Sequence, residues 1–159
     1  MTTTAFKTAL DSSLDRMYRT ALYLCGNRDD AADAVQDACI RLWERRDQLD
    51  TVTNFTAYAS MTVRNVCLDN IGKRRETAET DNDYADDTDI ERDLETKDTV
   101  DLIISAMSRL PDKQRIVMTM RDIDGCDYDE IINATGLSGT NIRVLLSRAR
   151  NTIRKFFNK

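Results

Sequence analysis

Hydrophobic residues recur every three or four positions along most of the chain, and this spacing is typical of amphipathic helices. In the N-terminal part it predicts helices over about residues 4–25 and 29–46, and a third helix that begins near Asn54. Gly26 is suited to end the first helix, and Asn54 is a suitable N-cap for the third. Trp43 falls on the apolar stripe of the second helix, so we expect its side chain to face the core.

Beyond residue 98, the same spacing predicts helices on both sides of Pro111 and up to Gly125. Asp127 can cap a short amphipathic helix, Thr135–Leu137 fit a tight turn, and a longer basic helix follows from Ser138. A short helix, a glycine turn and a longer basic helix in this order predict a helix-turn-helix. No segment requires a strand, so the predicted fold class is all-α.

Charge divides the chain into three segments. Residues 1–76 have a net charge of 0, residues 77–98 of −8 and residues 99–159 of +3. The middle segment has few apolar residues and no sustained periodicity, so it cannot bury enough surface to offset its ordering entropy. We therefore predict two small helical domains, 1–76 and 99–159, joined by a flexible acidic linker over 77–98.

Composition lowers the expectation of catalysis. The chain contains no histidine, and its four cysteines form no CxxC pair. The commonest general base is therefore absent, and no metal-ligand spacing is present. We predict no enzyme activity, no metal and no cofactor, and we interpret the cysteines as small core residues of a reducing compartment rather than as redox or metal sites.

No apolar run approaches bilayer length and no signal core is present, so we expect a cytoplasmic protein without membrane insertion.

The basic helix carries the strongest functional signal. Residues 138–159 hold six basic and no acidic residues, although the whole chain has a net charge of −5. Arg143, Ser147 and Arg150 share one helical face. Arginine can contact guanine and asparagine can contact adenine in the major groove, whereas Arg154 and Lys155 lie later and suit phosphate. This pattern favours a module that reads duplex DNA.

Four segments in order extend this interpretation to nearly the whole chain. They are GNRDDAADAVQDACIRLWERR, NFTAYASMTVRNVCLDNIGKRR, LPDKQRIVMTMRDIDGCDYDEI and GLSGTNIRVLLSRAR. Together they closely resemble the bacterial extracytoplasmic-function (ECF) sigma factors, the small two-domain sigma factors of RNA polymerase. The resemblance implies a sigma-2-type helical domain followed by a sigma-4-type helix-turn-helix domain.

The resemblance also implies roles for the matching residues. The stretch that binds the β′ clamp of core polymerase corresponds to Asp33, Gln36 and Asp37. The residues that read the −10 element as single-stranded DNA correspond to Thr51, Val52, Thr53, Asn54, Tyr58, Arg64, Asn65, Lys73 and Arg74. The residues that read the −35 element as duplex correspond to Thr140, Asn141, Arg143, Val144, Ser147 and Arg148. Apart from the resemblance, we expect Arg150, Arg154 and Lys155, which lie later on the basic helix, to contact the DNA backbone.

The partners implied are promoter DNA and core RNA polymerase, through its β′ clamp and β flap. In the family the linker threads through positively charged polymerase channels, where a net charge of −8 can imitate nucleic acid. An anti-sigma factor inhibits many members, and the sequence leaves open whether one binds this chain. Gly72, Asn141 and Leu145 depart from the family pattern, so no particular promoter sequence is carried over.

Two other function classes compete with this interpretation. A stand-alone helix-turn-helix regulator, with the first domain for dimerisation or ligand sensing, predicts specific duplex binding without polymerase. An enzyme with a metal site in the acidic linker is the weakest alternative, because no spacing of its acids fixes a coordination geometry.

Overall fold

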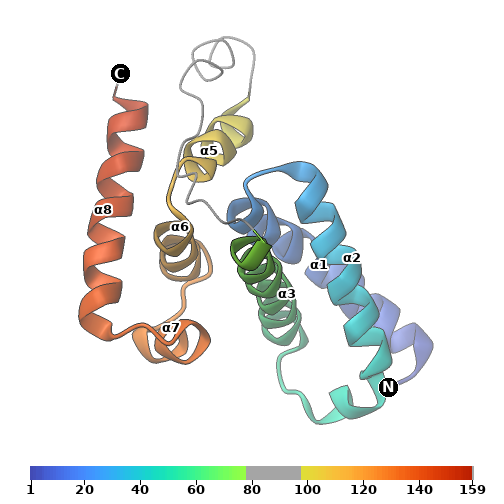
Figure 1. Ribbon diagram of the computed structural model, residues 1–159. Helices are drawn as coiled ribbons and strands as arrows, with labels where there is room; N and C mark the ends of the chain where they lie inside the picture. Colours follow the sequence, from blue (N-terminus) through green and yellow to red (C-terminus); the bar gives the residue numbers. More distant parts are fainter. Residues whose placement is uncertain (78–97, 159) are drawn as a thin grey trace. The chain divides into compact units, whose positions relative to one another are not determined.

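The computed structural model describes residues 1–77 and 98–158, and in these ranges it contains helices and turns but no strand. The chain divides into two compact units, residues 1–74 and 75–159. The all-α prediction is confirmed, and residues 78–97 of the predicted linker lie outside the described residues. The elements are α1 (Thr3–Cys25), α2 (Arg28–Glu44), η1 (Arg46–Thr51), α3 (Phe55–Thr77), α5 (Thr99–Ser108), α6 (Asp112–Met118), η2 (Thr119–Ile123), α7 (Tyr128–Thr135) and α8 (Gly139–Phe157). Figure 1 labels the α-helices.

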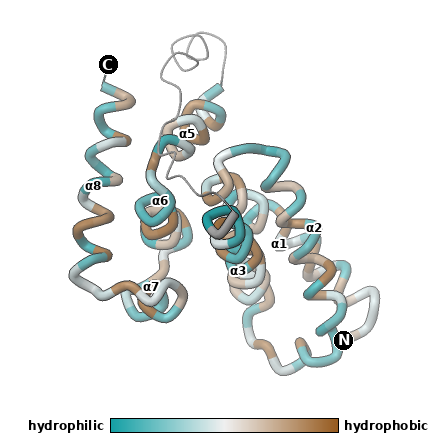
Figure 2. Tube along the Cα trace, viewed as in Figure 1, coloured by the Kyte–Doolittle hydropathy of each residue, from teal (hydrophilic) through white to brown (hydrophobic). Residues whose placement is uncertain are grey.

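The first unit depends on the packing of α2 against α1. Ala31, Ala34 and Ala38 recur every three to four residues along α2 and are fully buried. Because these side chains are small, α2 can approach α1 closely. Figure 2 colours the trace by hydropathy, and along the helices hydrophobic residues are interspersed with hydrophilic ones. The packing therefore leaves the polar face of α2 in solvent.

Helix α3 completes the first unit through contacts with α1. The rings of Phe6 and Phe55 meet edge to face with centroids 6.0 Å apart, and the hydroxyls of Ser13 and Thr56 lie 3.1 Å apart. Trp43, predicted to face the core, is instead 38% exposed. One edge of its ring packs on Phe6, while the Arg46 guanidinium lies over the ring, 3.9 Å from its centroid.

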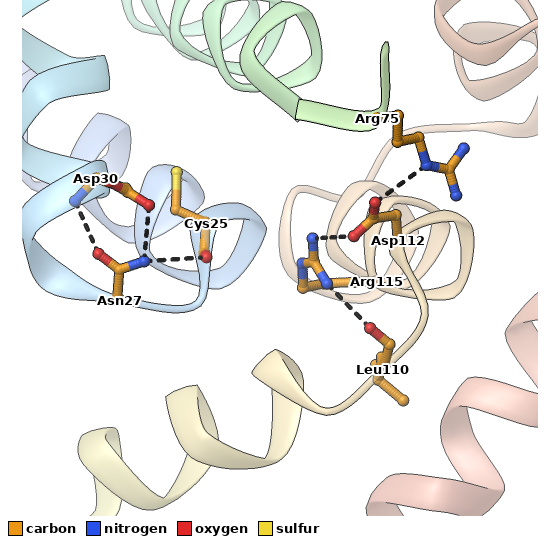
Figure 3. Close-up of polar contacts among 7 residues, drawn as sticks. All are labelled: Cys25, Asn27, Asp30, Arg75, Leu110, Asp112 and Arg115. Atoms are coloured by element: carbon orange, nitrogen blue, oxygen red, sulfur yellow. Dashed lines mark hydrogen bonds and ion pairs between the residues drawn. The ribbon is translucent and has the colours of Figure 1, made fainter. Parts of the chain in front are cut away.

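The turn between α1 and α2 is fixed by backbone conformation and side-chain caps. Gly26 adopts a left-handed conformation with φ of 78° and ends α1, as its sequence position predicts. Asn27 Oδ1 accepts a hydrogen bond of 2.8 Å from the backbone N–H of Asp30, and Asn27 Nδ2 donates one of 2.9 Å to the Asp30 carboxylate (Figure 3). These bonds satisfy groups that the start of α2 leaves without helical partners.

In the second unit, α6, α7 and α8 surround one core. Val117, Met120, Ile131, Ile142 and Leu146 are buried in it, and Leu145 and Cys126 complete the cluster. Gly136 has φ of 74° and its N–H donates to the carbonyl of Ile132 at 2.8 Å. Ser138 then caps α8 by accepting from the N–H of Asn141 at 3.1 Å. The predicted helix-turn-helix is confirmed, and its short helix begins with the predicted Asp127 cap, which Glu130 completes as a capping box.

The segment before the helix-turn-helix differs from the sequence prediction. The pattern predicts a helix that continues to Gly125, but the α-helix ends at Met118 and a π-helical turn covers Thr119–Ile123. The N–H of Asp124 donates to the carbonyl of Thr119 at 2.9 Å, which closes the wider turn. A π turn adds one residue to the ring of each hydrogen bond, and hydrophobic spacing does not reveal it.

Arg115 is a buried charge that ties α6 to the turn between α5 and α6. Its side chain donates to the carbonyl of Leu110 at 2.9 Å and to the Asp112 carboxylate at 2.8 Å (Figure 3). The residue is 4% exposed. Burial alone would raise the pKa of the Asp112 carboxyl, but the hydrogen bond and charge of Arg115 act in the opposite direction, and the net pKa lies below its usual value. Arg115 is thus a structural residue of the second unit.

We predict that Arg115→Met lowers the free energy of unfolding of the second unit by about 1–3 kcal/mol, because it leaves the Leu110 carbonyl and the Asp112 carboxylate without this donor. Thermal unfolding followed by circular dichroism measures the loss. Lys113→Met is the matched control, because Lys113 is exposed two residues away and its substitution should change stability by less than about 0.5 kcal/mol. Equal effects of the two substitutions would contradict a structural role for Arg115.

Candidate nucleic-acid and partner interfaces

The basic helix α8 has one buried face and one exposed polar face. Ile142, Leu145, Leu146 and Ala149 are buried against the second unit's core. The residues predicted to meet duplex DNA are all exposed, and they are Thr140, Asn141, Arg143, Val144, Ser147 and Arg148. The Ser138 cap orders the first turn of α8 beside them. The structure therefore brings the six predicted residues together on one surface, which we call the α8 face.

A shallow cavity of about 260 Å³ lies beside the α8 face. Arg143, Arg150 and Arg154 line it, together with Tyr128 from the start of α7. The guanidinium of Arg143 lies over the Tyr128 ring, 5.6 Å from its centroid, and this cation–π contact orients the arginine. The cavity gathers donors suited to an anion such as a DNA phosphate.

Arg150 is already held by an acidic partner. Its Nε and Nη2 donate to the two carboxylate oxygens of Asp122 at 2.9 and 2.6 Å, a bidentate ion pair. The hydrogen bond to Asp122 raises the pKa of the Arg150 guanidinium above its usual value. Arg150 was predicted to contact the DNA backbone, but in the structure Asp122 neutralises its charge. Among the described residues, the guanidinium of Arg148 has no such ion pair.

The second candidate surface lies on α2, opposite its buried alanines. Asp33, Gln36 and Asp37, the predicted polymerase-binding residues, are all exposed there. Ile40 is exposed on the same side, three residues after Asp37 and four after Gln36, and 55% of its surface is accessible. These four residues form what we call the α2 face.

The third candidate surface lies at the start and along the outside of α3. Thr51, Thr53 and Asn54 are exposed in the segment that leads into this helix, and Val52 is half-buried. Asn54 Oδ1 accepts from the N–H of Ala57 at 3.1 Å, which confirms the predicted cap. Further along α3 the side chain of Tyr58 is half-buried, whereas Asn65, Lys73 and Arg74 are exposed. We call this set, including Val52, the α3 face.

Arg64 does not belong to the α3 face. It was predicted to hold the DNA backbone, but it is 8% exposed. Its position explains the difference, because Arg64 lies four residues after Ser60 and three before Cys67, and both of these are buried. The charge of Arg64 is therefore part of the interior of the first unit, and we exclude it from the DNA-contacting set.

Comparison with known proteins identifies the two units. Residues 10–77 match the family described as Sigma-70 region 2. Residues 101–153 match the family described as Sigma-70, region 4. The chain belongs to the sigma-70 family. Its likeness to ECF RNA polymerase sigma factors extends over most of its length, so the resemblance predicted from the four segments is confirmed.

Two relatives illustrate the likeness. The chain is 28% identical over 151 residues to the ECF RNA polymerase sigma factor SigE of Mycolicibacterium smegmatis, covering 91% of this chain and 58% of that protein. It is 25% identical over 167 residues to the ECF RNA polymerase sigma factor SigW of Bacillus subtilis, covering 95% of this chain and 88% of that protein. The chain thus spans little more than half of the first relative and most of the second.

A solved structure supports the fold. The sigma factor RpoE of Bartonella quintana, in complex with the anti-sigma factor NepR, matches with a TM-score of 0.67 over 97% of each chain at 21% identity.

The described parts of the chain hold no cluster of three or more potential metal-binding side chains. Nor, within those parts, does a helix have the length and apolar character needed to cross a bilayer.

The structure adds three residues that the sequence did not indicate. Ile40 extends the α2 face, Tyr128 supports Arg143, and Asp122 pairs with Arg150. The helical spacing from Gln36 to Ile40 was visible in the sequence, but exposure of an isoleucine was not. Asp122 and Arg150 are separated by 28 residues and a turn, so their pairing requires the folded unit.

We predict that Asp122→Asn strengthens binding of this sigma factor to polyanions, because it releases the Arg150 guanidinium beside the α8 face. The slope of log K against log salt for duplex DNA should steepen by roughly 0.9 if Arg150 then takes one phosphate. Fluorescence anisotropy over a salt series measures this slope. Asp47→Asn, an equal charge change at an exposed position of the first unit, is the control. An equal effect of both variants would show that net charge alone matters.

Proposed function

We propose that this chain binds core RNA polymerase and directs it to promoters by reading the −10 element as single-stranded DNA and the −35 element as duplex. The observation that carries the proposal is the order of the two sigma-70 regions, each of which presents exposed polar faces at its predicted contact residues. The chain contributes recognition, and the polymerase contributes the chemistry. We place this activity in the cytoplasm, where polymerase and chromosome meet.

The α2 face is proposed to bind the clamp helices of the polymerase β′ subunit. Asp33 and Asp37 supply negative charge, Gln36 supplies hydrogen bonds, and Ile40 supplies an apolar contact. An apolar centre within a polar rim is the usual composition of a protein interface. The second unit is proposed to contact the β flap, as the family resemblance implies. An anti-sigma factor, where one binds, would have to mask one of these surfaces.

The α3 face is proposed to capture the opened −10 strand. The exposed Thr51, Thr53 and Asn54 can hydrogen-bond to unpaired bases, and the half-exposed ring of Tyr58 can stack on one. Lys73 and Arg74 lie further along α3 and can attract the sugar-phosphate backbone. Stacking with electrostatic attraction is the usual physical basis of single-strand binding.

The α8 face is proposed to enter the major groove at the −35 element. Asn141 and Arg143 lie in the first turns of α8, the part of a recognition helix that contacts base edges. Arg143 and Arg148 suit guanine, Asn141 suits adenine, and Val144, which is 41% exposed, can pack against a thymine methyl group. Arg154 and Lys155 follow toward the end of the helix and suit backbone phosphates.

We propose 1–76 and 99–159 as the two functional domains and 77–98 as the acidic tether. A tether makes the second DNA contact effectively intramolecular once the first has formed. Its net charge of −8 suits the positively charged polymerase channels through which family linkers pass. Because the whole chain has a net charge of −5, the free protein should bind DNA weakly.

The test is promoter binding with and without core polymerase. We expect the free chain to bind duplex promoter DNA only non-specifically, with a Kd of about 10⁻⁴–10⁻⁶ M. With core enzyme, the complex should bind a cognate promoter at about 10⁻⁸ M or tighter. A gel shift at fixed salt measures both. Asp37→Arg should abolish the gain by placing the wrong charge against the clamp, whereas Asp47→Arg, at an exposed position outside the α2 face, should preserve it.

Strong and specific binding by the chain alone, at paired symmetric half-sites, would overturn the proposal. That outcome would instead indicate a stand-alone helix-turn-helix regulator that binds as a dimer. In vitro transcription with core polymerase on a library of genomic promoters identifies the cognate sequence required for this test.

We predict that Arg148→Ala, and likewise Arg143→Ala, costs roughly 1–3 kcal/mol, or about 5- to 150-fold, in binding of the polymerase complex to a promoter with the cognate −35 element. The variants should also discriminate less well between cognate and altered −35 sequences. Arg150→Ala is the matched comparison, because its charge is already neutralised by Asp122. It should weaken binding less, and equally for all sequences. Loss of discrimination in Arg150→Ala alone would contradict the assignment.

A further inference from the structure

Two of the four cysteines lie in contact inside the first unit. The Cys25 thiol donates a weak hydrogen bond to Cys67 Sγ, and the two sulfur atoms are 3.7 Å apart. Cys25 is the last residue of α1, and Cys67 lies 42 positions later, in the middle of α3. None of the four cysteines, all of which the structure describes, forms a disulfide. The fold therefore holds this pair as adjacent thiols.

The position of Cys25 makes a covalent bond between the two sulfurs geometrically accessible. A disulfide has an S–S length of about 2.05 Å, so the sulfurs must approach by roughly 1.7 Å. Cys25 is the last residue of α1 and is followed directly by Gly26, so the backbone after Cys25 lies outside the regular helix. Asn27 Nδ2 donates to the Cys25 carbonyl at 3.5 Å and helps to hold its backbone (Figure 3). Rotation of the Cys25 side chain, with a small shift of the helix end, can close the distance.

The two thiols differ in their access to solvent, and this difference assigns them separate roles. Cys25 is partly exposed, whereas Cys67 is 0% exposed. A small oxidant therefore reaches Cys25 first. Cys67 is protected from solvent but lies in contact with the Cys25 sulfur, the position of a resolving thiol.

We propose that Cys25 and Cys67 form a reversible dithiol–disulfide site that reacts with hydroperoxides. The Cys25 thiolate attacks one peroxide oxygen, the O–O bond breaks, and Cys25 becomes a sulfenic acid while hydroxide leaves and takes up a proton. The Cys67 sulfur then attacks the Cys25 sulfur, the S–O bond breaks, and water leaves with the proton that Cys67 gives up. Overall, two thiols and one hydrogen peroxide give one disulfide and two waters, and a cellular dithiol reverses the oxidation.

The expected consequence is a more stable first unit. The bond joins α1 to α3 and closes a long loop, which restricts the unfolded chain. Neither cysteine belongs to the α2 face or the α3 face, so the disulfide leaves the proposed contact residues exposed. The site is independent of the proposed promoter-reading function, and it can be tested without polymerase or DNA.

The test is to titrate the full-length chain with hydrogen peroxide, count its remaining thiols and map disulfides by peptide mass spectrometry under non-reducing conditions. We expect loss of two of the four thiols in a monomeric product that contains a Cys25–Cys67 bond. Dithiothreitol should restore both thiols. The melting temperature of the first unit should rise on oxidation and return on reduction.

Cys25→Ser should prevent the bond and the rise in melting temperature, whereas Cys39→Ser is the matched control and should preserve both. Cys39 suits this purpose because it is partly exposed, as Cys25 is, but it lies on α2 and not in the Cys25–Cys67 contact. A bond that maps to Cys39 or Cys126, disulfide-linked dimers as the main product, or four thiols that are lost together to sulfinic and sulfonic acids would each overturn the proposal. Mapping in the unsubstituted chain decides the result even if Cys25→Ser fails to fold.

Discussion

The close packing of α2 through its alanine face fixes how this helix is oriented in the first unit. Ala31, Ala34 and Ala38 are fully buried, so the helix has almost no freedom to rotate about its axis. A rotation that exposed them would force Asp33 or Asp37 toward the interior, where an unpaired carboxylate is costly. The same packing that holds α1 and α2 together therefore orients the acidic side of α2 outward.

In the second unit, too, the buried residues of a helix determine which of its polar residues are exposed, but here the buried residues are large. Leu145 and Leu146 bury adjacent positions of α8, and this broad apolar stripe fixes which arginines reach solvent. Arg115 is enclosed and satisfied within the fold, Arg150 is bound by Asp122, and Arg143 is supported by the Tyr128 ring. Arginines of one small unit thus have different roles, because the contacts of each side chain rather than the net charge of the unit decide which of them remain exposed and unpaired.

The sequence indicated the elements better than it indicated the environment of individual side chains. Helix positions, the Asp127 and Asn54 caps and the turn at Gly136 follow from local rules that act over three or four residues. Burial of Arg64, exposure of Trp43 and contact between Cys25 and Cys67 depend on how three helices pack, which periodicity does not specify. The family resemblance implied contact residues on α2, α3 and α8 that are mostly exposed in the structure. It also implied a DNA contact for Arg64, and only the packing around Ser60 and Cys67 shows that this charge is buried.

Under the proposed function, the charge distribution gives a physical reason why two weak DNA-reading units serve better than one strong unit. Asp122 neutralises one arginine beside the α8 face, and the chain as a whole carries a net charge of −5. Each missing phosphate contact weakens binding to all DNA equally, including the vast excess of non-promoter sites. Weak units that act together through the polymerase lose little at a promoter, where both elements are occupied and the second contact is intramolecular. At other DNA only one unit finds its target, and its low affinity alone does not hold the complex there. The low affinity of each unit therefore increases the preference for promoters over bulk DNA.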